Sequence, residues 1–465
     1  MFSANVYTER RKRLKKEIKS GILLFLGNEE SPINYPDNSY IFRQDSSFLY
    51  FWGLDLPGLA AIIDIDADRD ILFGRDLTLN EKIWTGPQPA LKEHGMRSGV
   101  QDTAAFDRLE AELLQANQKG RNIHFLPQYR PQNLIRIQQL LGTDATLAKA
   151  SASGAFIKAV VAQRSIKTKE EIEQIEAALD ITREMQLLAM KMSKPDMYEK
   201  EVAGVMAGLS YSKGGAGLAF PIIFTVKGHI QHNPHHGNLM QAGDMIVNDS
   251  GAESVMHYAS DITRTFPVNG KFDRQQREIY SIVLEAQTKA IEAIQPGLEY
   301  RDVHFLACRH LTAGLKALGL IKGDVAAAVA AGAHALFMPG GLGHMLGLDV
   351  HDMEGLGEDY VGYTDEIQRS EQFGTCNLRL ARALESGFVI TVEPGLYFIP
   401  ELIDQWKAEK KFEEFINYNI VEAYRNFGGI RIEDDVLVIE DGRRVLGKPI
   451  PKSIEDVEAF SSQFL

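Results

Sequence analysis

Acidic residues inside apolar segments are the feature that most constrains this chain. Aspartate and glutamate are depleted in β-strands, yet several of them fall in strand-like runs of its second half. Asp249 ends "DMIVND", Asp261 opens "DITRTFPV", Glu393 lies in "VITVEPGLY" and Glu433 lies in "IRIEDDVLVI". One such carboxylate usually faces solvent or forms an ion pair. Four in one region predict a buried acidic cluster, which protonates or repels itself unless cations compensate it.

A glycine-rich segment adds histidine to this cluster. "GLGHMLGLDVHDMEG", residues 341–355, carries His344 and His351 seven residues apart. Glycine disfavours a helix here, and on a strand an odd separation places the two side chains on opposite faces. We therefore expect a loop that leads into a strand, and loops on a rigid scaffold often carry active sites.

The acidic cluster and this segment together predict a metal centre. The expected ligands are Asp249, Asp261, His344, Glu393 and Glu433. Such an oxygen-rich set with one imidazole suits Mn²⁺ or Co²⁺ better than a closed structural zinc site. Five ligands, several able to bridge, predict two ions. Two ions about 3.5–4 Å apart can share and acidify a water molecule, which is chemistry for hydrolysis.

Helix and strand patterns predict an α+β fold with two parts. The first part mixes helices with strands such as "GILLFLGN", "NIHFLP" and a hairpin in "AAIIDIDADRDILF". In the second, Thr168 and Glu171 fit a capping box that opens a long helix, and further helices are expected over about 273–294 and 301–318. Because helices and strands do not alternate there, a curved, mostly antiparallel sheet backed by helices is expected.

Composition narrows the partners and the compartment. The net charge of −13 argues against nucleic-acid binding, and no apolar run is long enough for a membrane helix. No signal-peptide pattern follows the basic N-terminal residues. Cys308 and Cys376 form no metal-like pair and favour a reducing compartment. We therefore expect a cytoplasmic protein that binds neither nucleic acid nor membrane.

Four motifs resemble the aminopeptidase P and prolidase family of Xaa-Pro peptidases. They are "NDSGAESVMHYASDITRTFPVNGKF", "GLGHMLGLDVHD", "TVEPGLYF" and "GGIRIEDDVLV"; "IFRQDSSFLYFWGLDLPGLAAII" is similar to the family's N-terminal domain. The resemblance implies an aminopeptidase P-like domain over 1–160 and a pita-bread catalytic domain over 161–465. It also implies two divalent ions, most often Mn²⁺ with Co²⁺ or Zn²⁺ possible. The implied substrates are peptides with proline in second position, and a homo-oligomer, dimer or tetramer, is expected.

The resemblance extends to individual residues. It assigns the five ligands above to the metal ions, with Glu393 also a proton shuttle. His351, His232 and Arg431 match residues around the substrate, and Trp84, in "IWTG", resembles a tryptophan that reaches toward a neighbouring subunit's site. Other interpretations stay open. His351 could be a structural partner of Asp352, Arg431 a plain ion pair, and Trp84 a core residue.

The sequence departs from the family pattern at three places. Asp249 and Asp261 are twelve residues apart where the family usually has eleven, which predicts a larger hairpin turn or a bulge. Gly340 stands where relatives commonly carry a substrate-contacting histidine. The long segment 398–429 between the two glutamates looks more like prolidase.

We therefore expect an Xaa-Pro aminopeptidase that uses a hydroxide activated by two metal ions. An Xaa-Pro dipeptidase is the alternative. A metal-free relative such as creatine amidinohydrolase, or a non-catalytic binding module of the same fold, is the remote one.

Overall fold

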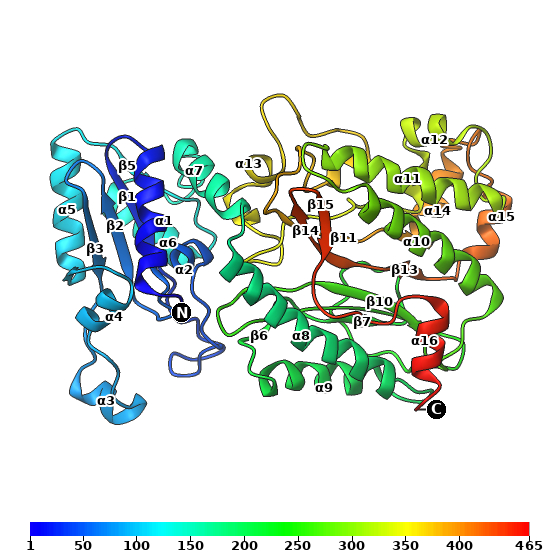
Figure 1. Ribbon diagram of the computed structural model, residues 1–465, viewed down its shortest axis with the longest axis horizontal. Coiled ribbons are helices and arrows are strands. Elements are labelled where there is room, and N and C mark those ends of the chain that lie inside the picture. The colour runs from blue at the N-terminus through cyan, green and yellow to red at the C-terminus, as the bar shows by residue number, and fades with distance from the viewer. Residues whose placement is uncertain (465) are drawn as a thin grey trace. The chain divides into compact units, whose positions relative to one another are not determined.

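The computed structural model describes residues 1–464, which form two compact units (Figure 1). The first unit comprises residues 1–164 and 355–360, and the second comprises the other described residues, 165–354 and 361–464. Among the described residues, no helix combines the length and the apolar character that crossing a bilayer requires.

The first unit is built on a five-stranded mixed sheet in the order β4-β3-β2-β1-β5. Its strands are β1 (Ile22–Leu26), β2 (Ala60–Asp64), β3 (Arg69–Phe73), β4 (Asp102–Ala104) and β5 (Ile123–Phe125). The predicted hairpin is confirmed, because β2 and β3 pair antiparallel around a turn in which Asp68 has a φ of 48°. The outer pairs β1–β5 and β3–β4 are parallel.

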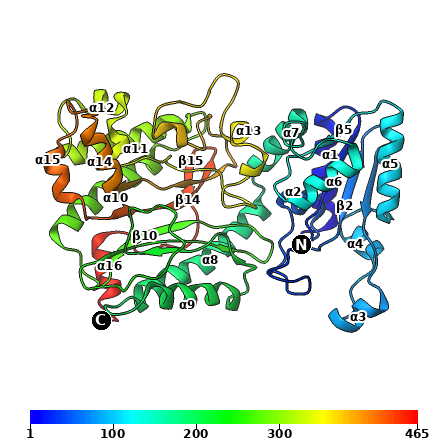
Figure 2. The ribbon, with the colours of Figure 1, turned by 180° about the vertical axis from the view of Figure 1, so that it is seen from behind.

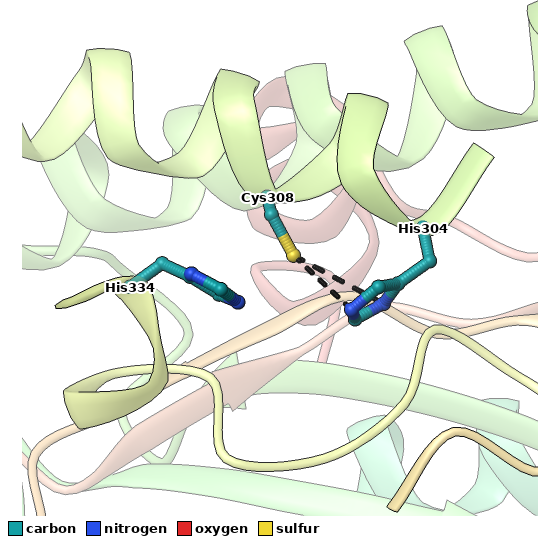
Figure 3. A group of neighbouring side chains, drawn as sticks. All are labelled: His304, Cys308 and His334. Atoms are coloured by element: carbon teal, nitrogen blue, oxygen red, sulfur yellow. Dashed lines mark hydrogen bonds between the residues drawn. The ribbon is translucent and has the colours of Figure 1, made fainter. Parts of the chain in front are cut away.

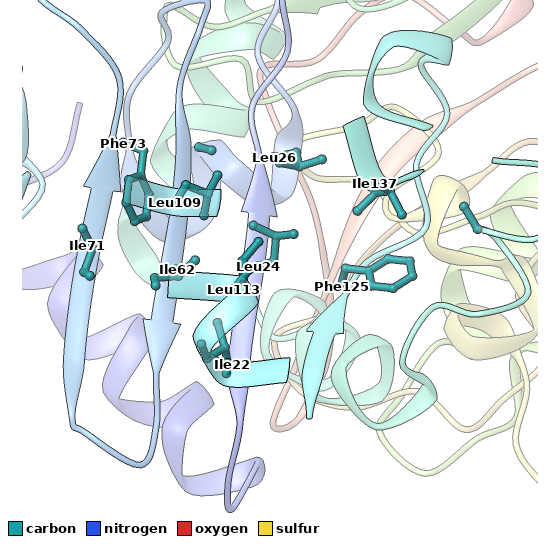
Figure 4. Packing of buried hydrophobic residues seen from close by; sticks show 13 residues of the cluster. Ile22, Leu24, Leu26, Ile62, Ile71, Phe73, Leu109, Leu113, Phe125 and Ile137 are labelled. Atoms are coloured by element: carbon teal, nitrogen blue, oxygen red, sulfur yellow. The ribbon is translucent and has the colours of Figure 1, made fainter. Parts of the chain in front are cut away.

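Alternating side chains of this sheet make the core of the first unit. Ile22, Leu24 and Leu26 of β1 share one face, as the two-residue period of a strand requires. Leu109 and Leu113 pack on that face from α5 (Figure 4). The helices of this unit are α1 (Ala4–Glu17), α2 (Ser46–Trp52), α3 (Leu79–Thr85), α4 (Leu91–Arg97), α5 (Phe106–Gln118), α6 (Pro131–Leu141) and α7 (Gly154–Ser165).

The strand pairs of the second unit are antiparallel, as predicted, but they form several small sheets where one curved sheet was expected. The strands are β6 (Gly217–Leu218), β7 (Ile223–Thr225), β8 (Met245–Ser250), β9 (Ala252–Glu253), β10 (Ile262–Pro267), β11 (Val389–Val392), β12 (Gly395–Tyr397), β13 (Gly429–Arg431), β14 (Asp434–Ile439) and β15 (Gly442–Val445). In both ribbon views β10 lies between the helix pair α8 and α9 and the helix pair α10 and α11 (Figures 1 and 2).

Local sequence signals begin the long helices of this unit. The Thr168–Glu171 capping box is present and opens α8 (Lys169–Met192), and a second box from Asp273 to Gln276 opens α10 (Arg274–Ala293). The other helices are α9 (Glu199–Ser212), α11 (Tyr300–Ala317), α12 (Val325–Ala331), α14 (Pro400–Ala408), α15 (Tyr418–Val421) and α16 (Ile454–Ser461). Helix α13 (Glu358–Gly362) begins in segment 355–360, which belongs to the first unit. Short 3₁₀ turns are η1 (Ala333–Leu336), η2 (Glu354–Leu356), η3 (Thr375–Asn377) and η4 (Glu422–Tyr424).

The expectation that all four carboxylates lie inside strands is wrong for three of them. Asp249 belongs to β8, but Asp261 directly precedes β10, Glu393 directly follows β11, and Glu433 lies between β13 and β14. These are places where the ladder is interrupted, so each carboxylate is held by strands on one or both sides without being part of a regular pair.

Candidate metal centre

The β8–β10 hairpin brings the two aspartates to one face. Asp249 pairs with Thr263, and Asp261 lies two residues before Thr263, which keeps it on the same side of the sheet. The register between Ser250 and Ile262 continues unchanged to the bridge between Glu253 and Ala259. The twelve-residue spacing therefore makes no bulge in the paired part. The separation of twelve residues is accommodated by a turn at residues 254–258, in which His257 has a φ of 65°.

A second pair of strands brings the two glutamates together. Val392 of β11 pairs with Asp434 of β14, and Gly395 of β12 pairs with Arg431 of β13. Continuing this register places Glu393 opposite Glu433. The backbone N–H of Glu433 donates to the carbonyl of Thr263 at 3.1 Å. This bond joins the glutamate pair to the aspartate hairpin.

The glycine-rich segment runs beside β11 and delivers His344. The N–H of Glu393 donates to the carbonyl of Leu342 at 2.8 Å, and the N–H of Thr391 donates to the carbonyl of His344 at 3.0 Å. A side chain at Gly343 is impossible at this approach, because a Cβ there would lie 2.1 Å from the carbonyl oxygen of Thr391. The predicted loop is therefore a segment bonded to a strand edge.

The imidazole of His344 is arranged to offer one nitrogen to a cation. Nδ1 lies 3.0 Å from the carbonyl oxygen of Met345, so this nitrogen carries the proton and donates. Nε2 lies 3.5 Å from Asp261 Oδ2 and 3.4 Å from Glu393 Oε1. Burial lowers the pKa of His344 well below its usual value. The ring is therefore neutral, and a backbone bond orients the free lone pair.

Arg431 pairs with Asp249, but in the described part of the chain the other carboxylates of this centre form no ion pair with a lysine or an arginine. Burial raises the pKa of Asp261 and of Glu433 well above the ordinary values, and the neighbouring carboxylates raise them further. Among residues 1–464, one buried oxygen of each of Asp249, Asp261 and Glu433 has no hydrogen-bond partner. These orphaned oxygens, with His344 Nε2, suit a divalent cation.

Asp434 shows what internal compensation looks like. It is as buried as the centre, yet Arg264 bonds one of its oxygens at 2.7 Å and Lys452 bonds the other at 2.6 Å. Although burial raises the pKa of Asp434, these two cations hold it at about 2. Asp261 and Glu433 have no such pair of cations among the described residues, which indicates that a bound metal ion balances their negative charge.

Arg431 steadies the centre through three contacts. Its guanidinium forms an ion pair with Asp249, donates to Thr263 Oγ1 at 3.1 Å and donates to Tyr397 Oη at 2.8 Å. Arg431 is buried, with 5% of its surface exposed. The partner in this ion pair is one of the expected ligands, and a contact of Arg431 with the substrate stays a prediction.

His351 lies beside His344 but has a different environment. The two ring centroids are 4.3 Å apart, and His351 Nδ1 lies 2.6 Å from Glu354 Oε2. Asp352 pairs with Lys167 Nζ at 2.9 Å. The side chain of His351 is 31% exposed where that of His344 is 5% exposed. His351 is therefore the histidine that solvent or substrate can reach.

The remaining expected residues are more exposed. His232 lies in the exposed loop 229–237, where burial and the charge of Arg431 lower its pKa while Asp249 raises it. These effects place it within electrostatic range of the centre. Trp84 of α3 is 81% exposed, so its interpretation as a core residue is wrong.

Two threonines of the centre were missed at the level of sequence. Thr391 Oγ1 accepts from the N–H of His344 at 3.1 Å and donates to Glu393 Oε1 at 3.2 Å. Thr263 Oγ1 donates to Glu433 Oε2 at 2.7 Å. Each threonine lies two residues from an expected ligand and therefore on the same strand face. That spacing is the signal that could have found them.

A neutral, oriented imidazole among buried carboxylates on antiparallel strands suits a metal-dependent hydrolase. The chain belongs to metallopeptidase family M24, whose model matches residues 173–440, and the model of the aminopeptidase P N-terminal domain matches residues 7–124. This membership confirms the predicted family, fold class and enzyme class.

Relatives of known activity match nearly the whole chain. The Xaa-Pro dipeptidase of Homo sapiens is 31% identical over 467 residues, covering 96% of this chain and 90% of the relative. The Xaa-Pro aminopeptidase of Escherichia coli K12 is 31% identical over 471 residues, covering 98% of each. Among solved structures, Zn-substituted E. coli aminopeptidase P in complex with product has a TM-score of 0.80 at 29% identity, covering 100% of this chain and 99% of the other.

The uncompensated carboxylates predict an unusual pH dependence of stability in the metal-free protein. Raised pKa values make the folded state hold the protons of Asp261 and Glu433 more tightly than the unfolded state does. As pH rises above about 4, the unfolded state loses these protons first and is favoured. Stability should fall by about 1.4 kcal/mol per pH unit for each proton still held. Melting temperatures of EDTA-treated protein between pH 5 and 8 measure this fall.

Two asparagine variants supply the contrast. Asp261→Asn should flatten the pH dependence and raise the melting temperature of the metal-free protein near pH 8. Asp434→Asn should lower it, because breaking a buried ion pair costs about 3–5 kcal/mol. If Asp261→Asn and the unmodified chain have identical melting curves at every pH, the pH dependence does not come from the carboxylates of this centre.

Proposed function

We propose that this metallopeptidase hydrolyses the bond between an N-terminal residue and a following proline. The observation that carries the proposal is that donor atoms of His344, Asp261 and Glu433 lie within 4.8 Å of one another, and that both carboxylates keep a buried oxygen without a partner among residues 1–464. The names of the relatives, Xaa-Pro aminopeptidase and Xaa-Pro dipeptidase, supply the substrate class. A proline nitrogen in a peptide bond carries no hydrogen, so the site needs to accept a ring without an acceptor for that N–H.

The proposed cofactor is a pair of divalent ions, Mn²⁺ before Co²⁺ or Zn²⁺. The proposed ligands are Asp249, Asp261, His344, Glu393 and Glu433. Oxygen-rich donors favour Mn²⁺, and four carboxylates offer enough charge for two ions. When bound, such ions acidify a shared water and polarise the scissile carbonyl.

The side chains around the ions have separate proposed roles. Glu393 is the proton carrier as well as a ligand, because its side chain is 23% exposed and accepts a hydrogen bond from Thr391. His351 acts on the substrate carbonyl or the departing proline nitrogen. Arg431 positions Asp249 through their ion pair. His232 contacts the substrate from the exposed loop.

We favour the aminopeptidase over the dipeptidase, since the E. coli aminopeptidase matches over 98% of both chains. Segment 398–429, which carries α14 and α15, is the feature that points the other way. Assays with Xaa-Pro dipeptides and with longer Xaa-Pro-Xaa peptides separate the two. Cleavage of longer peptides with comparable kcat/KM supports the aminopeptidase. Cleavage of dipeptides alone overturns it in favour of the dipeptidase.

Gly340 offers a direct test of the substrate shell. Its φ is not in the left-handed region, and a Cβ there would meet Gln231 Oε1 at 3.7 Å, which is an ordinary contact. Gly340→His should therefore fold and place an imidazole close to Gln231. One added hydrogen bond is worth about 0.5–1.5 kcal/mol, so kcat/KM for proline peptides should rise about three- to tenfold. Steady-state kinetics measure this rise at unchanged metal content.

The control for Gly340→His is Gly204→His, in which the glycine lies exposed on α9 with open space at its Cβ. Its kinetics should match those of the unmodified chain. Equal kcat/KM for Gly340→His and Gly204→His would show that position 340 lies away from the substrate.

We also propose a homo-oligomer whose contact includes α3. Trp84, Ile83 and Leu79 of this seven-residue helix are 81%, 70% and 77% exposed, and clustered exposed apolar side chains favour association. Trp84→Ala should therefore shift the mass measured by light scattering toward the monomer and lower kcat/KM. Leu114→Ala, at an exposed leucine of α5, is the matched control. An unchanged mass and rate for Trp84→Ala would contradict the role of α3.

A reducing, cytoplasmic location completes the proposal. Cys308 and Cys376 are both free thiols, which suits such a compartment.

A further inference from the structure

A second cluster of metal-binding side chains lies in the catalytic unit, apart from the carboxylate centre. His304 and Cys308 are four residues apart on one face of α11, and His334 faces them from η1 (Figure 3). All three are buried, and one donor atom of each lies within 4.8 Å of the donors of the other two. None of them belongs to the expected ligand set of the peptidase.

His334 is buried without a hydrogen-bond partner. The residue is 3% exposed, and neither ring nitrogen has a partner among residues 1–464. The backbone of Val329 raises the pKa of His334, but no contact that either ring nitrogen makes with the described residues has full hydrogen-bond geometry. Leaving a buried polar group unsatisfied costs free energy. Because the ring is directed toward Cys308 (Figure 3), a ligand bound between them would remove that cost.

The protonation states are suitable for metal binding. Burial lowers the pKa of His304 to about 3 and that of His334 to about 4, so both rings are neutral and offer lone pairs. Burial raises the pKa of Cys308 to about 12, against the lowering effects of the Arg309 charge and of a backbone hydrogen bond. The thiol is therefore protonated when no metal is bound. Metal binding would release that proton to solvent and form the thiolate.

Distances in the cluster match a thiolate–imidazole site. Cys308 Sγ lies 3.5 Å from His304 Nε2. In tetrahedral sites with metal–sulfur bonds of about 2.3 Å and metal–nitrogen bonds of about 2.0–2.1 Å, sulfur and nitrogen ligands are about 3.6 Å apart. The pair on α11 is therefore already at ligand spacing. The donor nitrogen of His334 lies within 4.8 Å of the other two donor atoms, so a small movement of its ring would bring it to ligand spacing.

We propose that His304, Cys308 and His334 bind one soft, thiophilic metal ion, with Cu⁺ preferred to Zn²⁺. Thiolate sulfur with imidazole nitrogen selects these ions over the hard ions that suit carboxylates. One thiolate and two neutral imidazoles carry a charge of −1. Cu⁺ makes the buried site neutral, whereas Zn²⁺ leaves a net positive charge that burial disfavours. The bound ion would tie α11 to η1.

Titration of the whole protein with Cu⁺ under anaerobic conditions, against a chromogenic Cu⁺ chelator, tests the site. Long incubation allows the buried residues to open. The unmodified chain should hold one Cu⁺ that Cys308→Ala loses, with affinity at least 100-fold weaker in the variant. Cys376→Ala is the matched control, because Cys376 is the other free cysteine and is partly exposed. It should keep the ion.

A parallel titration with Zn²⁺ is read by the thiolate-to-metal absorption, which carboxylate-bound Zn²⁺ does not produce. Should Cys308→Ala destabilise the fold, X-ray absorption of the unmodified protein loaded with one Cu⁺ gives the same answer through a sulfur neighbour. Equal Cu⁺ and Zn²⁺ binding by Cys308→Ala and Cys376→Ala, or the absence of sulfur around copper, would overturn the proposal.

Discussion

Replacement of His351 by alanine is expected to lower kcat about 10²- to 10⁴-fold while leaving the metal content unchanged. Proton transfer or oxyanion stabilisation by a positioned side chain is typically worth this much. His351 lies 4.3 Å from the ring of His344 but bonds Glu354, and its partial exposure lets it meet a substrate. Single-turnover rates measured beside elemental analysis of the same samples give both quantities.

The matched control for His351→Ala is His235→Ala. His235 is an exposed histidine of loop 229–237 for which no catalytic role is proposed, and its loss should leave kcat unchanged. If His351→Ala releases metal as readily as His344→Ala does, the proposed roles are wrong. His351 would then be a metal ligand like His344 and not a residue that acts on the substrate.

Glu433→Gln should lose both metal and activity, which distinguishes it from His351→Ala. Glu433 is 1% exposed, and one of its oxygens has no partner among the described residues while the other accepts from Thr263. Removing even an outer-shell group typically costs 10- to 100-fold in metal affinity. Loss of a ligand should therefore weaken binding by more than about 100-fold. The neutral amide also relieves repulsion from Glu393, so the metal-free variant should melt higher than the metal-free unmodified chain.

Isothermal titration with Mn²⁺ and melting curves with and without EDTA measure these effects. Glu440→Gln, at an exposed glutamate just after β14, should behave like the unmodified chain. Full peptidase activity in Glu433→Gln with normal Mn²⁺ affinity would remove Glu433 from the ligand set.

Local patterns predicted the elements of the catalytic unit well, because the signals are local. The Thr168–Glu171 box opens α8 as predicted, and apolar runs gave β8 and β10. Acidic residues are unusual in such apolar runs, and the acidic residues that this pattern singled out are the ones that lie close together in the structure. Their position at the ends of strands was not predicted, because a break in a ladder depends on which strands pair.

Long-range pairing explains the other differences. The register that sets Glu393 opposite Glu433 comes from pairs such as Val392 with Asp434, which no local pattern specifies. Likewise, Asp352 had a nearer candidate partner in His351, but the fold brings Lys167 to it.

The histidine–cysteine cluster was missed for a related reason. The two cysteines lie far apart in the sequence and form no pair, whereas Cys308 lies beside a histidine one helical turn away and beside His334 from another element. The four-residue spacing of His304 and Cys308 was visible, but His334 could be added only from the fold.

Metal content measured beside peptidase activity in one preparation tests the central claim, that the carboxylate centre holds two catalytic divalent ions. After dialysis, loading with Mn²⁺ and removal of loosely bound ions, elemental analysis should approach two Mn²⁺ per chain. Activity toward Xaa-Pro peptides should rise and fall with that content across partly loaded samples. A preparation with close to zero divalent metal per chain and full peptidase activity would contradict the account.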